Sequence, residues 1–211
     1  MQRILERFPR LFVGVIPGKQ RCMFTSGMVC QHATVLTESP LVLYPRSAQF
    51  CSECLRTAPC NTHDSMRKRE ELEKEKHLSK YQRMARRLIG ALGEERALEA
   101  VSELCFVELG KDDVESRIIG ALHLNVFGLE QGSVLLQACS LLNHSCEPNC
   151  FVELIPDQEP MIRLVASQEI PAMTELTVAY VDLQLPFQER SAYLEWAFGF
   201  KCQCPRCRRE S

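Results

Sequence analysis

Three cysteines near the end of the chain constrain its fold more than any other feature. They follow the pattern Cys202-x-Cys204-x2-Cys207, with Pro205 stiffening the turn between the last two. Thiolates this close together are typical of a structural zinc site, which closes with four Cys or His ligands. No Cys or His follows Cys207, so the fourth ligand must come from an earlier part of the chain.

The best candidate for that ligand is Cys146, in the stretch Ser-Leu-Leu-Asn-His-Ser-Cys-Glu-Pro-Asn-Cys at residues 140–150. Asn, Ser and Pro together favour a tight, irregular turn. Polar groups held in such a turn behind an apolar segment, here residues 134–136, are more often a site than a packing device. The alternative is a plain hairpin turn whose His and Cys have no chemical role.

Composition limits the class of protein. A length of 211 residues favours one domain, or one domain with a small insert. The first residues lack the apolar stretch and cleavage site of a secretion signal, and no apolar run is long enough to span a bilayer. We therefore expect an intracellular protein, cytoplasmic or nuclear, with no membrane partner. A net charge of −2 gives no strong case for direct nucleic-acid binding.

A second group of cysteines precedes a highly charged segment. The twelve cysteines of an intracellular chain are more often metal ligands or free thiols than disulfides. Cys51, Cys54, Cys60 and His63 are candidate ligands of a second zinc, but the two pairs are unusually close in sequence. The alternative is a reduced cysteine loop.

The remaining pattern alternates between strands and helices. The basic residues between 67 and 87 outnumber the acidic ones, and a solvated helix face is favoured over a contact with nucleic acid or a histone tail. We predict strands at 11–15, 22–29, 34–42, 150–155, 161–166 and 175–182, a turn at 156–160, and helices at 66–92, 94–109, 113–123 and 188–196, the first of them with a charged, solvated first half.

Three motifs together resemble the C-terminal half of a SET-domain lysine methyltransferase. They are Asn143-His144-Ser145-Cys146, then Glu175-Leu-Thr-Val-Ala-Tyr180, then Phe198-x-Phe200 followed by the cysteine triad. The amino-acid sequence of residues 140–150 resembles that of the SET-and-MYND branch in particular. Met23-Phe24, residues 34–42 and Asn125-Val-Phe are similar to other strands of that branch. The resemblance covers about residues 20–50 and 125–207.

The resemblance implies a mixed β+α protein with a β-rich SET fold of small antiparallel sheets. Its C-terminal segment would thread through a loop as a pseudoknot. The implied segments are N-terminal SET strands at 8–49, a remnant of a zinc (MYND-like) module at 50–65, a helical insert at 66–124, a C-terminal SET core at 125–182 and a post-SET zinc segment at 183–211.

The resemblance also implies S-adenosylmethionine-dependent methylation of a lysine in a protein substrate, such as a histone tail. Tyr180 would be the catalytic residue, directed at the transferring methyl group, and Phe198 would line the lysine channel with it. An aromatic residue on a half-buried strand is the alternative for Tyr180. The implied cofactor-binding residues are Arg21, Met23, Asn125, Asn143, His144 and Phe200, and the implied zinc ligands are Cys146, Cys202, Cys204 and Cys207.

This sequence departs from the family at the Gly-x-Gly that lets the backbone approach the cofactor. Gln20-Arg21-Cys22 stands there instead, and side chains at these positions can crowd the cofactor. The MYND module is at most a remnant, and the family's C-terminal helical domain has no counterpart before Ser211. The competing hypothesis is therefore a catalytically inactive SET-fold scaffold that binds zinc and protein partners.

Overall fold

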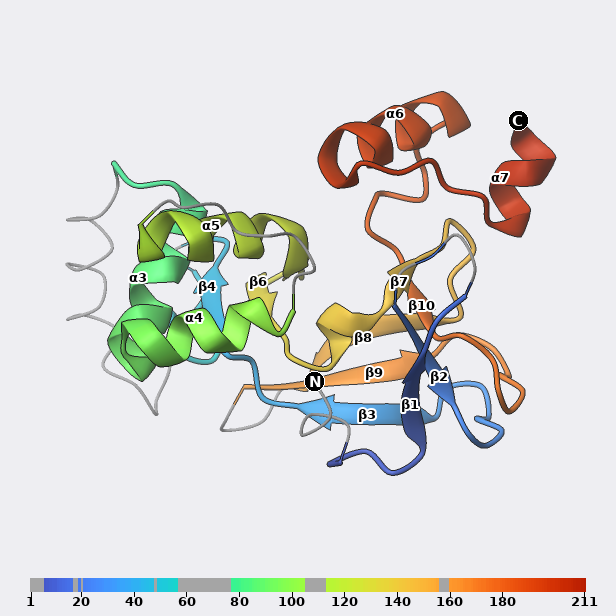
Figure 1. Cartoon of the computed structure of the whole chain (residues 1–211), viewed down its shortest axis with the longest axis horizontal. Coiled ribbons are helices and arrows are strands. Elements are labelled where there is room, and N and C mark those ends of the chain that lie inside the picture. Colours follow the sequence, from blue (N-terminus) through green and yellow to red (C-terminus); the bar gives the residue numbers. More distant parts are fainter. Residues whose placement is uncertain are drawn as a thin grey trace. The chain divides into compact units, whose positions relative to one another are not determined.

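The computed structural model describes residues 6–16, 19, 21–47, 49–56, 77–104, 113–155 and 160–211. The chain divides into two compact units, which Figure 1 draws together and which we describe separately. The first unit contains residues 1–37, 141–153 and 163–211. The second contains residues 38–140 and 154–162.

Short strands make up most of the first unit. Each strand is two to six residues long, and the sheets contain only two or three strands (Figure 1). The strands are β1 (Leu11–Gly14) antiparallel to β2 (Cys22–Thr25), the three-stranded sheet of β3 (Thr34–Glu38), β9 (Met161–Ala166) and β8 (Cys150–Ile155), and the pair β7 (Asn143–His144) and β10 (Thr177–Val178).

The pairing of β7 with β10 is parallel and positions the proposed site. Asn143 lies opposite Thr177, and His144 lies opposite Val178. Parallel strands need a long crossover connection, and here it is supplied by the intervening residues, which include β8 and β9. Two of the sequence motifs that are far apart in the chain therefore lie side by side.

Two helices complete the first unit. Helix α6 (Phe187–Phe198) ends at Gly199, whose φ of 72° is the left-handed conformation that glycine adopts without steric cost. Helix α7 (Pro205–Glu210) begins with proline at its first position, where the missing N–H removes no hydrogen bond. Leu194 of α6 is buried against Cys146 and Cys207.

Helices dominate the second unit. An antiparallel sheet, in the order β4, β6, β5, contributes Val42 and Leu135 to a core that also contains Met84, Leu88 and Ile118. Its elements are β4 (Val42–Pro45), α3 (Lys80–Leu92), α4 (Glu94–Ser102), α5 (Val114–Asn125), β5 (Val126–Gly128), β6 (Gly132–Leu135) and the short 3-10 helix η1 (Cys139–Leu141).

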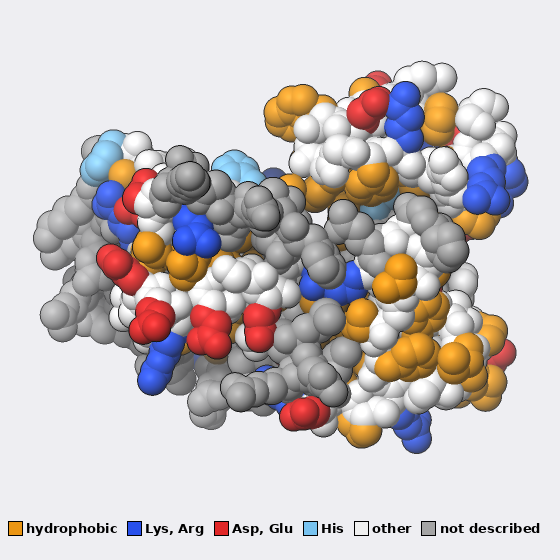
Figure 2. All heavy atoms as spheres, in the orientation of Figure 1, with side chains coloured by type: hydrophobic (Ala, Val, Ile, Leu, Met, Phe, Trp, Pro, Cys, Tyr) orange, Lys and Arg blue, Asp and Glu red, His pale blue; other side chains and the backbone are white. Residues whose placement is uncertain are grey.

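Local signals explain where these helices begin. Ser79 caps α3, with the reciprocal Gln82 bond of a capping box. The Asp113 carboxylate accepts from the Ser116 N–H at the start of α5. Figure 2 shows acidic side chains along the exposed side of α4, as expected for a solvated helix face.

Several predicted element boundaries are wrong. The predicted strand 34–42 is two strands, β3 and β4, because the segment at Pro40 cannot continue the ladder. The predicted strand 22–29 ends at Thr25, with only an isolated bridge at Val29, and the predicted strand 175–182 shrinks to Thr177–Val178 plus an isolated bridge at Glu175.

Other predictions lie partly outside the described residues. Helix α4 ends at Ser102, and residues 105–109 of the predicted helix 94–109 are not among those described. The same holds for residues 156–159 of the predicted turn and for residues 66–76 of the predicted insert. Across the described part of the chain, every helix is too short or too polar to cross a membrane.

Candidate active site and zinc centre

Backbone and amide hydrogen bonds fix the turn at residues 143–150. The Ser145 N–H donates to the Val178 carbonyl at 3.0 Å. The Asn149 side chain donates to the Glu175 carbonyl at 2.8 Å and accepts from the Thr177 N–H at 2.8 Å. Asn149 is buried, so its amide replaces strand-to-strand bonds that the short β7–β10 ladder lacks. The turn is therefore rigid at the point where the motifs meet.

The Asn143 side chain ties this turn to the segment before β2. Its Nδ2 donates to the Arg21 carbonyl at 2.6 Å and to Glu175 Oε1 at 2.9 Å, and it lies 3.3 Å from Cys22 Sγ. Glu175 also forms an ion pair with Lys19, and only 12% of its side chain is exposed. The two predicted cofactor-binding positions, Asn143 and Arg21, are thus in direct contact.

The segment that replaces the family's Gly-x-Gly is partly visible. Gln20 lies outside the described residues, whereas Cys22, in place of the second glycine, is completely buried, as is Met23. Burial, followed by the hydrogen bond and negative charge of Glu175, raises the pKa of the Cys22 thiol. The thiol is therefore neutral, and it is enclosed among Asn143 and Glu175.

His144 connects the turn to Tyr180 and to Cys146. Its Nδ1 accepts from the Tyr180 N–H at 3.0 Å, and its Nε2 lies 3.2 Å from Cys146 Sγ. Burial, reinforced by the positive charge of Arg190, lowers the pKa of His144 to about 4. The ring is therefore neutral near pH 7, and because Nδ1 accepts, its proton is assigned to Nε2, which donates to the sulfur.

Tyr180 lies in a cluster of aromatic rings. Its hydroxyl donates to the Leu142 carbonyl. Its ring centroid is 4.9 Å from that of Phe198 and 5.4 Å from that of His144. Phe200 lies 6.1 Å from His144 and 6.4 Å from Phe198. These are ordinary distances for tilted aromatic pairs, so the predicted channel residues and the turn form one packed group.

Burial determines the protonation state of Tyr180. It raises the pKa of the hydroxyl to about 12, with a smaller contribution of the same sign from Glu175 and an opposing one from Arg21. The hydroxyl is therefore a neutral donor at physiological pH. A role in orienting a substrate fits this state, whereas a role as a general base does not.

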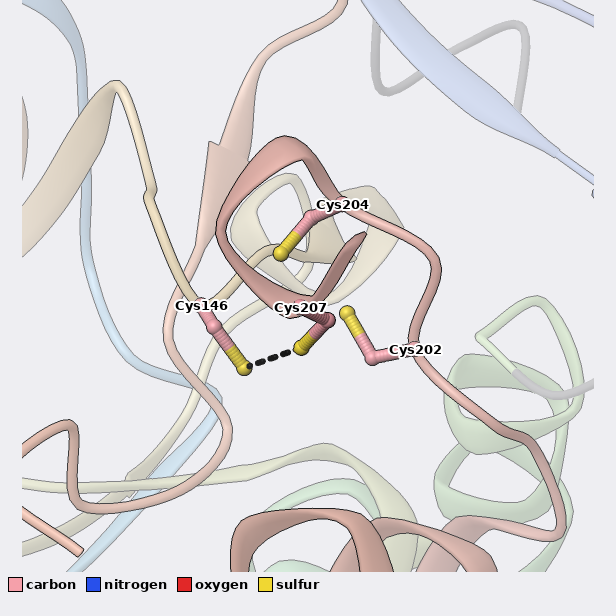
Figure 3. A group of neighbouring side chains, drawn as sticks. All are labelled: Cys146, Cys202, Cys204 and Cys207. Carbon is pink, nitrogen blue, oxygen red and sulfur yellow. Dashed lines mark hydrogen bonds between the residues drawn. The ribbon is translucent and has the colours of Figure 1, made fainter. Parts of the chain in front are cut away.

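The four cysteines predicted to bind zinc converge (Figure 3). Their sulfur atoms all lie within 4.8 Å of one another, and those of Cys146 and Cys207 are 3.5 Å apart. Zn–S bonds of about 2.3 Å in a tetrahedron place the sulfurs roughly 3.8 Å apart. Cys146 comes from the turn, Cys202 follows α6, and Cys204 and Cys207 belong to the start of α7. This set of donors fits a zinc ion with little adjustment.

The charges at this cluster also favour a cation. Burial raises the pKa of Cys202 and of Cys207, and the hydrogen bond to Cys146 adds to the effect at Cys207. Burial alone would raise the pKa of Cys204 too, but backbone N–H groups at Cys207 and Cys146 outweigh it and lower that pKa to about 7. Four adjacent thiolates repel one another, and a divalent cation removes that repulsion.

The other predicted site residues belong to the second unit. Asn125 ends α5, and its Nδ2 donates to the carbonyl four residues earlier at 2.8 Å. Cys51 and Cys54 are both buried and pack together. Cys60 and His63 lie outside the described residues. A second zinc at this position therefore stays a prediction.

Sequence reasoning missed two groups at the site. Glu175 is the first residue of the motif that ends at Tyr180, but the motif does not predict that its carboxylate holds Asn143. The pattern of residues 188–196 predicts an ordinary helix, yet the Arg190 side chain is 1% exposed and contacts Cys146. Nothing in the spacing of α6 distinguishes Arg190 from a solvated arginine.

Comparison with protein families gives one match. The model described as "SET domain" matches residues 22–181, which is more than half of the chain. The matched range includes both the 143–150 turn and Tyr180.

Curated proteins match over shorter stretches. The mouse protein "Histone-lysine N-methyltransferase SMYD3" is 41% identical over 78 residues, which cover 37% of this chain and 18% of that protein. The fission yeast "SET domain and MYND-type zinc finger protein 6" is 39% identical over 66 residues, covering 31% of this chain and 13% of that protein. This chain thus spans less than a fifth of either relative.

Among solved structures, the SET domain of LSMT bound to lysine and AdoHcy has a TM-score of 0.56 and 11% identity. The alignment covers 95% of this chain and 56% of that one. At this identity the likeness concerns the fold, and it agrees with the β+α architecture predicted from the sequence. The SET-domain model matches more than half of this chain, and several relatives are named for SET and MYND domains. This chain therefore belongs to the SET-domain family, as its SET-and-MYND motifs had indicated.

Proposed function

We propose that this protein transfers a methyl group from S-adenosylmethionine to a lysine side chain of a protein substrate. The observation that carries the proposal is the bond from the Tyr180 N–H to His144 Nδ1, 3.0 Å long, which joins two family motifs in one packed site. The names of the relatives, histone-lysine methyltransferases, support the same activity. So does the solved neighbour that holds lysine and AdoHcy.

The proposed cofactor site is built around β7. The backbone of Asn143 and His144 holds the methionine and adenosine parts, and Phe200 covers the adenine. Asn143 has a second role, because its amide fixes the carbonyl of Arg21 and so the segment that replaces Gly-x-Gly. When bound, S-adenosylmethionine supplies an activated methyl group on a sulfonium. Met23 is a proposed supporting residue at this site.

Tyr180 and Phe198 are the proposed walls of the lysine channel. The tyrosine is held at both ends, by the His144 ring at its backbone N–H and by the Leu142 carbonyl at its hydroxyl. Such fixation supports in-line alignment of the amine with the methyl group. The hydroxyl oxygen and neighbouring carbonyls can accept weak C–H···O contacts from the methyl, which help aim it.

The substrate lysine must lose a proton before it can react. With a normal pKa near 10.4, this costs about 4 kcal/mol at neutral pH. Desolvation between the rings of Tyr180 and Phe198 lowers the pKa of the amine, because it disfavours the charged form. The neutral Tyr180 hydroxyl adds no charge of its own. The channel therefore assists the reaction by excluding water rather than by acid–base catalysis.

The proposed zinc ion is structural. Its ligands Cys146 and Cys202 connect the turn directly to the segment that carries Phe198 and Phe200. Metal binding would therefore hold the aromatic residues over the site. Histones are the proposed substrates, from the names of the relatives, which would place the protein in the nucleus, the cytoplasm or both.

Methyl transfer can be tested with isotopically labelled S-adenosylmethionine and a core histone mixture, with lysine methylation read by mass spectrometry. The unchanged protein should label a lysine, and Tyr180→Phe should label it at least 10-fold more slowly with cofactor affinity nearly unchanged. Trp196→Ala serves as control, because that side chain is 81% exposed. Equal rates for Tyr180→Phe and the unchanged protein would show that the catalytic assignment is wrong.

One observation favours a second function, a catalytically inactive SET scaffold that binds protein partners. Cys22 occupies a glycine position of the family, and its side chain fills the space beside Asn143. If that thiol blocks the cofactor, the zinc turn remains as a rigid surface without activity. Cofactor binding separates the two functions, since the scaffold needs none.

A further inference from the structure

Arg190 is one of the least exposed side chains of the first unit, although it carries a full charge. Only 1% of its side chain is exposed, and it belongs to the first turn of α6. An arginine stays charged at all physiological pH values. Burying a charged group without partners is strongly unfavourable, so its contacts should explain why it is there.

Those contacts converge on the zinc cluster. The Arg190 Nε donates to Cys146 Sγ at 3.4 Å, and one terminal nitrogen donates to the Leu185 carbonyl at 2.5 Å. The other terminal nitrogen forms an ion pair with Glu210 of α7. A single guanidinium thus links α6, the metal turn and the helix that contains Cys207.

A second arginine extends this arrangement. Arg206 pairs with Glu210 at 2.8 Å and donates to the Leu183 carbonyl at 3.0 Å and to the Cys146 carbonyl at 3.4 Å. Glu210 is therefore shared by two cations, which fixes the Arg190 fork in one orientation. Of these two arginines, Arg190 is the one whose side-chain N–H reaches a sulfur.

We propose that Arg190 is a positioning residue of the zinc centre, which donates a charged hydrogen bond to the Cys146 thiolate and offsets part of the charge of the metal complex. A zinc ion with four thiolates carries a net charge of −2, and this complex lies in a partly buried site. Charge-assisted bonds to thiolate strengthen the ligand set, as outer contacts of metal ligands generally do. The inference rests on the proposed zinc site.

His144 supplies the comparison within the same site. Its Nε2 lies 3.2 Å from the same sulfur. Cys146 is therefore contacted by two nitrogen groups, from His144 and from Arg190. Removal of Arg190 leaves the His144 ring in place beside the sulfur.

Zinc release tests the proposal. The purified protein is first assayed for zinc, where one ion per site is expected, and then mixed with a chromophoric chelator in excess. Arg190→Met should transfer zinc about 10- to 100-fold faster than the unchanged protein, which is the range for outer contacts of metal ligands. Arg190→Lys keeps the charge but not the planar fork of N–H donors. Its rate of zinc transfer should lie between those of Arg190→Met and the unchanged protein. Arg209→Ala is the matched control, since that arginine is exposed and pairs with Glu147 across the same two segments.

A spectrum distinguishes this role from a general loss of stability. In the cobalt-substituted protein, the thiolate-to-metal charge-transfer band should move to lower energy in Arg190→Met, because the sulfur electrons lose a stabilising positive charge. Glu210→Gln, which leaves Arg190 in place but frees it, should give a smaller shift. If Arg190→Met releases zinc at the unchanged rate and leaves the band in place, the inference is wrong. Absence of zinc from the unchanged protein would instead overturn the zinc site itself.

Discussion

Replacing His144 by alanine removes the group that joins the cofactor turn to Tyr180 and to the zinc ligand Cys146. The Tyr180 N–H loses its acceptor at 3.0 Å, and the Cys146 sulfur loses its neutral donor at 3.2 Å. A buried donor left without a partner costs about 1–3 kcal/mol, and a hydrogen bond to a charged sulfur contributes about as much. Contacts with the rings of Tyr180 and Phe200 add roughly 0.5–1.5 kcal/mol each.

These contributions share atoms and are not additive, so we expect a loss of about 3–4 kcal/mol. For a chain of this size, 1 kcal/mol corresponds to about 2–4 °C in melting temperature. The first unit of His144→Ala should therefore melt roughly 6–16 °C lower, measured by circular dichroism at saturating zinc. His77→Ala, at an exposed position, should melt within about 2 °C of the unchanged protein. A loss below about 1 kcal/mol for His144→Ala would refute the view that this ring holds the site together.

Three further outcomes follow from the same contacts. The pKa of Tyr180 is raised to about 12, so its hydroxyl stays protonated up to about pH 11. The methylation rate should rise with pH at the same midpoint in Tyr180→Phe as in the unchanged protein. Loss of that rise in the variant would identify the tyrosine as the base. Cys146→Ser should lower the zinc content measured by atomic absorption and increase protease cleavage within residues 198–211, whereas an unchanged zinc content would assign the fourth ligand to another residue. Gly132→Ala should destabilise the second unit by about 2 kcal/mol or more in urea denaturation, because the added Cβ would lie 2.4 Å from the Tyr44 carbonyl oxygen. Gly128→Ala is the control, since no atom lies within 4 Å of its added Cβ. Equal losses of stability for the two variants would contradict this explanation.

The grouping of the four cysteines was predictable from the sequence. Ligand number alone required a partner for Cys202, Cys204 and Cys207, and the rigid turn pointed to Cys146. The structure brings these four sulfurs together. Such predictions succeed because a tetrahedral site has a fixed number of ligands and tolerates few geometries.

The contacts around these residues were not predictable. Strand periodicity does not reveal that Thr177–Val178 pairs in parallel with Asn143–His144, because the partner of a strand is set by tertiary packing. The burial of Arg190 was hidden for a similar reason. A surface helix normally exposes its arginines, whereas Glu210, the Leu185 carbonyl and the sulfur of Cys146 make burial favourable here.

Strand boundaries failed where local chemistry interrupts a favourable pattern. Residues 34–42 have uniform strand propensity apart from Pro40, yet β3 ends at Glu38. The Glu38 carboxylate accepts from the N–H groups of Gln137, Ala138 and Cys139 at 2.8–2.9 Å. These bonds hold the chain just before Pro40, which cannot continue the ladder, and strand propensity does not predict them.

The central claim, that this protein is an S-adenosylmethionine-dependent enzyme in spite of Cys22, is tested most directly by calorimetry with S-adenosylmethionine and with S-adenosylhomocysteine. If Cys22 is accommodated by its contacts with Asn143 and Glu175, both should bind once per chain at micromolar concentration. Asn143→Ala should weaken both by about 10-fold or more, because it releases the Arg21 carbonyl. Absence of binding heat at high micromolar concentration, for the unchanged protein and equally for Cys22→Gly, would contradict the enzymatic function and leave the scaffold.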